Sequence, residues 1–159
     1  MKIDTDSIKV NKFRDKYIDE KRWFVMKKIL IDGNKFSDLE GFYTEMDKLL
    51  TKDLDWKTGH NMNAFNDLLS GGFGVHEYGE PLHIEWINFA KSRQDLGYHA
   101  TKNYYQELLK KCHPSSRENV ESRLQEVEEC KGKTILDMIV DIILDTDDSG
   151  HWCELYTED

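Results

Sequence analysis

The segment between Gly59 and Gly72, GHNMNAFNDLLSGG, restricts the possible folds of this chain more than any other. When it is wound at about 100° per residue, its large apolar side chains share one side of a helix: Met62, Phe65, Leu68 and Leu69. The opposite side carries Asn63, Asn66 and Asp67. Such a helix packs on a core and shows fixed polar groups to water, as most amphipathic helices do, or to a partner.

Strand and helix signals follow one another along the rest of the chain. An apolar run predicts a first strand over Trp23–Ile31, ended by a turn at Asp32-Gly33-Asn34. Ser37 or Asp38 is suited to cap the helix that follows. The later expected elements are a strand over Pro81–Trp86, a helix over Trp86–Gln94, an apolar helix over Thr134–Asp145 and a strand near Trp152–Tyr156.

The ordered set of motifs resembles the barstar family, the intracellular inhibitors of the secreted ribonuclease barnase. The motifs that carry the resemblance are Ile31-Asp32-Gly33, Asp38-Leu39, Gly59-x-Asn61-Met62-x-Ala64-Phe65-x-Asp67-x-Leu69 and the run from Pro81 to Phe89. The resemblance extends from about Lys27 to Tyr156, apart from an insertion near Leu96–Lys133. At Asn63 and Asn66 the founding inhibitor carries an aspartate and a tryptophan.

The resemblance implies an α/β fold: a small three-layer structure in which a short parallel sheet of about three strands is packed by helices. We expect residues 1–22 to form an N-terminal extension and residues 23–159 to form the barstar-like domain. Apolar residues at helical spacing predict an α-hairpin insertion at about 96–133. Ser115 and Glu118 have the spacing of a capping box at the start of its second helix.

The resemblance also implies a function: inhibition of a cytotoxic ribonuclease by an acidic helix and the loop after it. Asp67 is the carboxylate expected to occupy the phosphate position of the enzyme, with Asn63 and Asn66 bonding around it. The remaining predicted partner-binding residues are the aromatic Phe73 and Tyr78 and the acidic Glu77, Glu80, Asp145 and Asp148. We expect a 1:1 complex with a basic enzyme and no catalytic residue in this chain.

Charge supports a basic protein partner. The net charge is −9 over 159 residues, which disfavours direct binding to nucleic acid. Residues 1–25 carry seven basic and five acidic side chains, a balance of +2, so the rest of the chain carries −11. The sequence shows neither a signal peptide nor a run of about 20 apolar residues, and we expect a cytoplasmic protein without a membrane anchor.

Two other classes of function stay open at this stage. One is an acidic interaction module whose basic partner is not a nuclease. The other is a metal-dependent hydrolase that uses Asp145, Asp147, Asp148 and His151. Cys112, Cys130 and Cys153 lack the usual zinc-site spacing even with His113 and His151, so we expect free thiols and no cofactor.

The last helix raises a separate question. Asp137, Asp141 and Asp145 lie on one stripe at intervals of four residues, where like charges cost about 0.2–0.5 kcal/mol per pair. Either nearby cations relieve this repulsion, or the surface tolerates it, as an ordinary solvated stripe or as part of a binding site.

Overall fold

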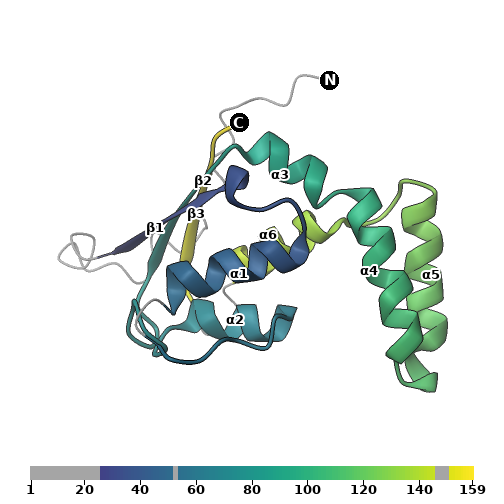
Figure 1. Cartoon of the computed structure of the whole chain (residues 1–159), viewed down its shortest axis with the longest axis horizontal. Coiled ribbons are helices and arrows are strands. Elements are labelled where there is room, and N and C mark those ends of the chain that lie inside the picture. The colour runs from purple at the N-terminus through teal and green to yellow at the C-terminus, as the bar shows by residue number, and fades with distance from the viewer. Residues whose placement is uncertain (1–25, 52–53, 146–150) are drawn as a thin grey trace.

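The computed structural model describes residues 26–51, 54–145 and 151–159 (Figure 1). The elements are β1 (Lys27–Asp32), a 3-10 turn (Gly33–Lys35), α1 (Leu39–Leu50), α2 (Met62–Ser70), β2 (Leu82–Ile87), α3 (Phe89–Asp95), α4 (Tyr98–Lys111), a 3-10 turn (Pro114–Ser116), α5 (Arg117–Glu128), α6 (Ile135–Leu144) and β3 (Cys153–Thr157). The expected N-terminal extension lies outside the described residues, and the proposed domain boundaries stay a prediction.

The three strands form one parallel sheet in the order β1-β2-β3. Ile31 pairs with Trp86, and Ile84 pairs with Leu155, so apolar residues align across the strands. Alternate positions are buried along β1 and β2, which leaves one face in the core and the other more exposed. The predicted α/β class, with a short parallel sheet packed by helices, is confirmed.

Aromatic side chains join the sheet to α1 and α2. Trp86 is fully buried and stacks on Phe42, with ring centroids 5.7 Å apart. Phe65 of α2 meets the other side of this cluster edge-on, 5.3 Å from Phe42. The predicted apolar side of the 59–72 segment therefore packs on the core, because Phe65, Leu68 and Leu69 are all buried. Asp38 caps α1 as expected, accepting a hydrogen bond from the Gly41 amide at 2.7 Å.

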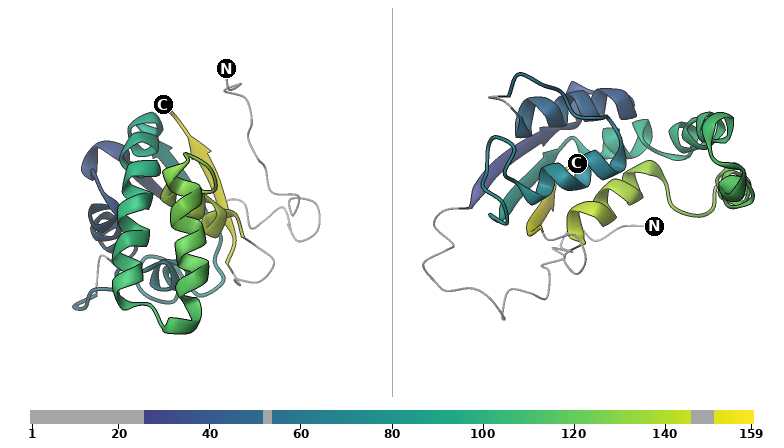
Figure 2. Two further views of the ribbon diagram at one scale, coloured as in Figure 1. Left: turned by 90° about the vertical axis from the view of Figure 1, so that its right-hand side faces the viewer. Right: turned by 90° about the horizontal axis from the view of Figure 1, so that it is seen from below.

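The insertion is an antiparallel hairpin of α4 and α5 that projects from the body (Figures 1 and 2). Its base is fastened to α6, where the Ile135 amide donates to Thr101 Oγ1 at 2.8 Å and the Leu136 amide donates to the Leu96 carbonyl. The expected capping box at Ser115 is wrong. The Ser115 hydroxyl and amide both bond to His113 Nδ1 in a 3-10 turn, so α5 begins without a side-chain cap.

The capping box of this chain lies on α6 instead. The Thr134 hydroxyl accepts from the Asp137 amide at 3.2 Å, and the Asp137 carboxylate accepts from the Thr134 amide at 2.8 Å. Asp141 is paired with Lys133. Asp137 and Asp141 thus have local partners that offset their repulsion. No helix in the described part of the chain is both long and apolar enough to cross a membrane.

Candidate functional site

Helix α2 is held at both ends by features of its own sequence. Asn61 begins it, accepting a hydrogen bond from the Ala64 amide at 2.8 Å. Gly71 ends it with φ 84° and ψ −172°, a backbone conformation restricted to glycine. The carbonyl oxygen of Glu77 would lie 2.2 Å from a β-carbon at position 71. The helix is therefore placed by a cap, a buried face and a close backbone approach.

The outer side of α2 presents the three predicted polar residues. Asn63 and Asp67 are exposed and Asn66 is half-buried. Among the described residues, the Asp67 carboxylate has neither a hydrogen bond nor an ion pair with another side chain. Asp67 is also the only charged residue between Met62 and Ser70. The helix therefore carries one exposed carboxylate that is not engaged by the described part of the fold.

The loop after α2 is tied back onto that helix. The Gly79 amide donates to the Ser70 carbonyl and the Gly72 amide donates to the His76 carbonyl, both at 2.8 Å. The buried His76 ring bonds to the Leu69 carbonyl through Nε2 at 3.1 Å. These bonds close the loop into a compact unit beside the helix.

The acidic residues of the loop differ in their roles. The Glu80 carboxylate accepts a hydrogen bond from the Glu77 amide at 2.8 Å, and the Glu80 amide donates to the Glu77 carbonyl. Glu80 thus helps to shape the loop, a role that the sequence prediction lacked. Glu77 is exposed. Of the two predicted loop carboxylates, that of Glu77 is the more exposed.

Exposed aromatic side chains flank α2 on both sides. Trp56, before the helix, and Phe73, after it, contact each other edge to face with centroids 6.0 Å apart, and they are 49% and 39% exposed. Tyr78 is 76% exposed. Phe73 and Tyr78 are predicted partner-binding residues, and that role stays a prediction; Trp56 was not among the residues predicted from the sequence.

Asp145 directly follows α6, which packs beside α2 (Figures 1 and 2). Asp145 is exposed, and it interacts with another group of the protein. Asp148 lies outside the described residues. The structure therefore brings the α2 residues and the loop residues together, and it places Asp145 at the end of the neighbouring helix.

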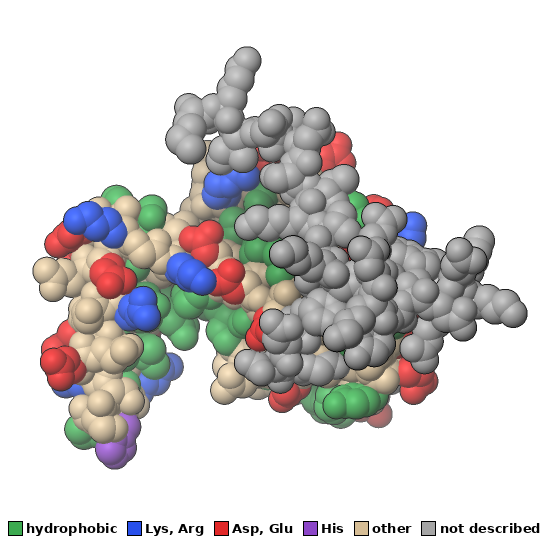
Figure 3. All heavy atoms as spheres, turned by 180° about the vertical axis from the view of Figure 1, so that it is seen from behind, with side chains coloured by type: hydrophobic (Ala, Val, Ile, Leu, Met, Phe, Trp, Pro, Cys, Tyr) green, Lys and Arg blue, Asp and Glu red, His purple; other side chains and the backbone are tan. Residues whose placement is uncertain are grey.

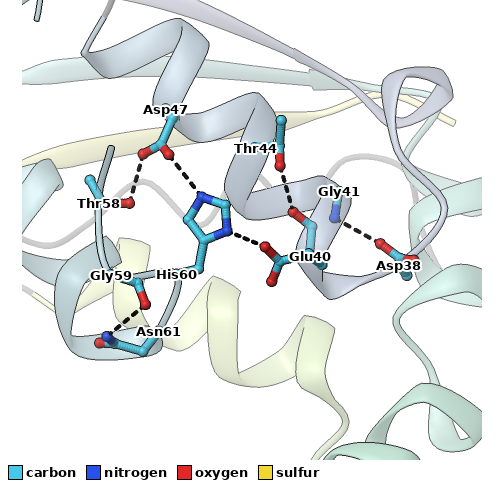
Figure 4. A network of polar contacts seen from close by, with 9 residues as sticks. All are labelled: Asp38, Glu40, Gly41, Thr44, Asp47, Thr58, Gly59, His60 and Asn61. Carbon is cyan, nitrogen blue, oxygen red and sulfur yellow. Dashed lines mark hydrogen bonds and ion pairs between the residues drawn. The ribbon is translucent and has the colours of Figure 1, made fainter. Parts of the chain in front are cut away.

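A polar network fixes the chain that enters α2 (Figure 4). His60 Nε2 lies 2.8 Å from Asp47 Oδ2 and His60 Nδ1 contacts Glu40, so one ring touches two carboxylates of α1. Thr58 Oγ1 donates to the other oxygen of Asp47 at 2.6 Å. The hydrogen bonds from Glu40 and then Asp47 raise the pKa of His60 above its usual value. We call Glu40, Asp47, Thr58 and His60 the His60 bridge.

Residues 26–134 match the model of the protein family described as Barstar (barnase inhibitor). This match covers more than half of the chain. The chain belongs to the barstar family. A search of curated proteins found no significant match.

Barstar-family membership agrees with an inhibitor rather than an enzyme. His151, a member of the hydrolase alternative, is fully buried, and its Nε2 is 2.7 Å from the Ile142 carbonyl. Burial lowers the pKa of His151, so its neutral ring donates to the backbone through Nε2. Asp147 and Asp148 lie outside the described residues. Within the ranges that the structure describes, no group of three or more His, Cys, Asp or Glu side chains has the arrangement of a metal site.

The cysteines of this barstar-family chain are separate free thiols, as predicted. Cys153 is buried in β3, and burial raises its pKa to about 12. A thiol in that environment stays protonated at neutral pH and acts as a small apolar side chain.

Proposed function

We propose that this protein is a stoichiometric inhibitor of a cognate cytotoxic ribonuclease, an immunity protein that works in the cytoplasm. The observation that carries the proposal is Asp67: an exposed carboxylate without a protein partner in the described chain, on a helix fixed at both ends. Membership of a family of barnase inhibitors supports it.

The physical basis is imitation of the substrate. A ribonuclease must bind phosphate, so its active site gathers Arg, Lys and His side chains in a concave cleft. A helix with a well-placed carboxylate enters such a cleft, and Asp67 takes the place of the phosphate. Asn63 and Asn66 then hydrogen-bond to the rim. The helix that carries these groups is already fixed at both ends in the free protein, which limits the backbone entropy lost on binding.

Aromatic and acidic side chains complete the proposed interface. Phe73 and Tyr78, together with Trp56, supply exposed rings of the kind that dominates binding energy at interfaces. Glu77, Asp145 and Asp148 add negative charge that draws a basic enzyme toward α2. Glu80 contributes by holding the loop in shape.

The test is capture of the native partner from cell extract. The full chain and its Asp67→Ala variant serve as baits, and Glu118→Gln on the exposed hairpin serves as the control variant. We expect the wild-type chain and E118Q to retain a basic ribonuclease and to abolish its activity at a 1:1 ratio. D67A should retain far less of it.

The alternative function, an interaction module for a basic protein that is not a nuclease, predicts a different result. The captured partner would then lack ribonuclease activity, and that outcome would overturn the inhibitor proposal. Loss of capture with E118Q as well as D67A would show that Asp67 is not the contact.

A further inference from the structure

The two contacts of His60 require a charged ring. An ionised carboxylate only accepts hydrogen bonds, and a neutral imidazole has a single N–H to donate. Both His60 nitrogens face carboxylate oxygens, Nε2 that of Asp47 and Nδ1 that of Glu40. Only the imidazolium donates to both at once. In a neutral ring, one nitrogen lone pair would face a carboxylate across the same contact.

The surroundings of the ring provide no substitute cation. From α1 the groups that face His60 are Glu40, Asp47 and the ring of Tyr43, whose centroid is 5.7 Å away. Burial and then the nearby Tyr104 of α4 raise the pKa of Tyr43, so this hydroxyl stays neutral while His60 titrates. Among the described residues, no Lys or Arg pairs with Glu40 or Asp47. Loss of the proton therefore leaves two carboxylates next to a neutral ring.

The bridge lies at the point where the chain turns into α2. His60 has φ 47°, a left-handed conformation that costs a non-glycine residue about 1 kcal/mol or more. The next residue, Asn61, is the N-cap of α2. The side chain of His60 is 19% exposed and that of Asp47 is 10% exposed, so the contact with Asp47 is shielded from water. The contacts that fix His60 therefore also fix the N-cap and the first turn of α2.

We propose that His60 is a positioning residue for the binding surface of α2: its imidazolium joins Glu40 to Asp47 and thereby fixes the first turn of the helix, which loosens when the ring loses its proton. The consequence for binding depends on the proposed function, whereas the consequence for α2 in the free protein does not. Because Glu40 and Asp47 raise the pKa of His60, the stabilising effect is complete below pH 6.5 and is lost as the pH rises through the raised pKa.

The decisive experiment uses the free full-length protein. NMR titration of the imidazole signals gives the midpoint for His60, and hydrogen exchange of the α2 amides, corrected for intrinsic rates, gives their protection at each pH. The variants are His60→Gln, Glu40→Gln and the control His83→Gln. His83 also lies between two carboxylates, Glu85 at 3.2 Å and Glu154 at 3.5 Å, but it belongs to the sheet.

We expect the wild-type midpoint above 6.5 and a roughly tenfold loss of α2 protection as the pH rises through it, the scale of one charge-assisted hydrogen bond. H60Q should show, at every pH, the low α2 protection that the wild type shows only above its midpoint. E40Q should move the His60 midpoint toward 6.5. H83Q should behave as wild type. If His60 titrates without any change in α2 protection, or with a midpoint at or below 6.5, the proposal is wrong. E40Q decides the question if H60Q does not fold, because Glu40 is exposed.

Binding gives a second readout, with barnase as the probe and calorimetry at several pH values. The dissociation constant of the wild type should rise about tenfold as the pH passes the His60 midpoint. This rise is counted after subtracting any pH-dependent change that H60Q shows as well. A pH dependence identical in the wild type and H60Q would overturn the role of His60 in binding. Absence of barnase binding at every pH would count against a barnase-type target, and the free protein would still decide the role of His60.

Discussion

At the scale of single residues, the side chains of α2 that pack on the core are different from those that are exposed to solvent. Phe65 is 2% exposed and contacts the aromatic core, while Asp67, two positions later, is exposed and has no partner within the described chain. An exposed, unpaired carboxylate contributes little to folding. Substitution of Asp67 therefore tests binding almost independently of stability.

If the proposed function is right, Asp67→Ala should weaken the complex with the ribonuclease by several kcal/mol. Close charge pairs at the barnase–barstar interface, the founding pair of this family, are coupled by about 1.5–7 kcal/mol, and that measured range sets the expected scale. The free energy of unfolding should change by less than about 0.5 kcal/mol. Calorimetric titration measures the first quantity and urea unfolding the second.

Glu118→Gln on the hairpin is the matched control for that measurement, since it also removes one exposed negative charge. A loss of affinity as large in E118Q as in D67A would mean that general charge, rather than the position of Asp67, determines binding.

At the scale of elements, α2 depends on the rest of the fold. It is nine residues long, well below the roughly 12–15 residues at which an isolated helix becomes marginally stable in water. Its order comes from the Asn61 cap, the buried face and the loop that returns after Gly71. The rigidity of the polar side of α2 therefore depends on these three attachments.

Gly71→Ala should destabilise the protein and weaken partner binding together. The φ and ψ of Gly71 cost other residues about 1–3 kcal/mol, and a β-carbon would in addition meet the Glu77 carbonyl at 2.2 Å. Gly79→Ala is the control, because Gly79 also has positive φ but nothing within 4 Å of an added β-carbon. Urea unfolding should show the larger loss for G71A. Equal losses of unfolding free energy in G71A and G79A would mean that the backbone near Glu77 shifts at little cost to accommodate the added β-carbon.

At the scale of the whole molecule, the acidity is concentrated on the body that carries α2. The hairpin region 96–133 has seven basic and six acidic side chains, a balance of +1, and residues 1–25 have +2. The remainder therefore carries −12, and residues 134–159 contain eight acidic and no basic residues. On the visible face of the hairpin, basic and acidic side chains are interspersed (Figure 3). The hairpin thus adds size without extending the acidic surface.

Association with a basic partner should slow steeply as salt is added. Screening shortens the range of the field from about 30 Å at 0.01 M to about 8 Å at 0.15 M ionic strength. We expect the association rate constant to fall by an order of magnitude or more over this interval, with a much smaller change in dissociation. Stopped-flow measurements check this. Association that does not depend on salt would contradict steering by the acidic body.

The stability of the whole fold should fall in mild acid through His151. Because burial lowers the pKa of this ring, the unfolded chain binds the proton more readily, so the contribution of His151 to stability is complete above pH 6.5 and declines as the pH falls toward the lowered value. Urea unfolding at several pH values from 7.5 to about 5 measures the slope. His151→Gln should flatten it, whereas His99→Gln, at an exposed position on α4, should leave it unchanged.

Local patterns in the sequence were enough to predict the elements and the two sides of α2. Apolar spacing located the helices to within a few residues, and the exposed positions of Asn63 and Asp67 followed from the same periodicity. This succeeds because helix periodicity, caps and turns depend on residues no more than about four positions apart. The motif order likewise indicated the family.

Local sequence patterns could not predict the contacts between segments that are distant in the sequence. His60 meets Asp47 and Glu40 from 13 and 20 residues away, and Trp56 meets Phe73 across the whole of α2. Ser115 had the sequence of a cap, yet its hydroxyl is engaged by His113. Which partner a polar or aromatic side chain finds depends on the packing of the completed fold, because several partners of similar energy compete and only their final distances select one.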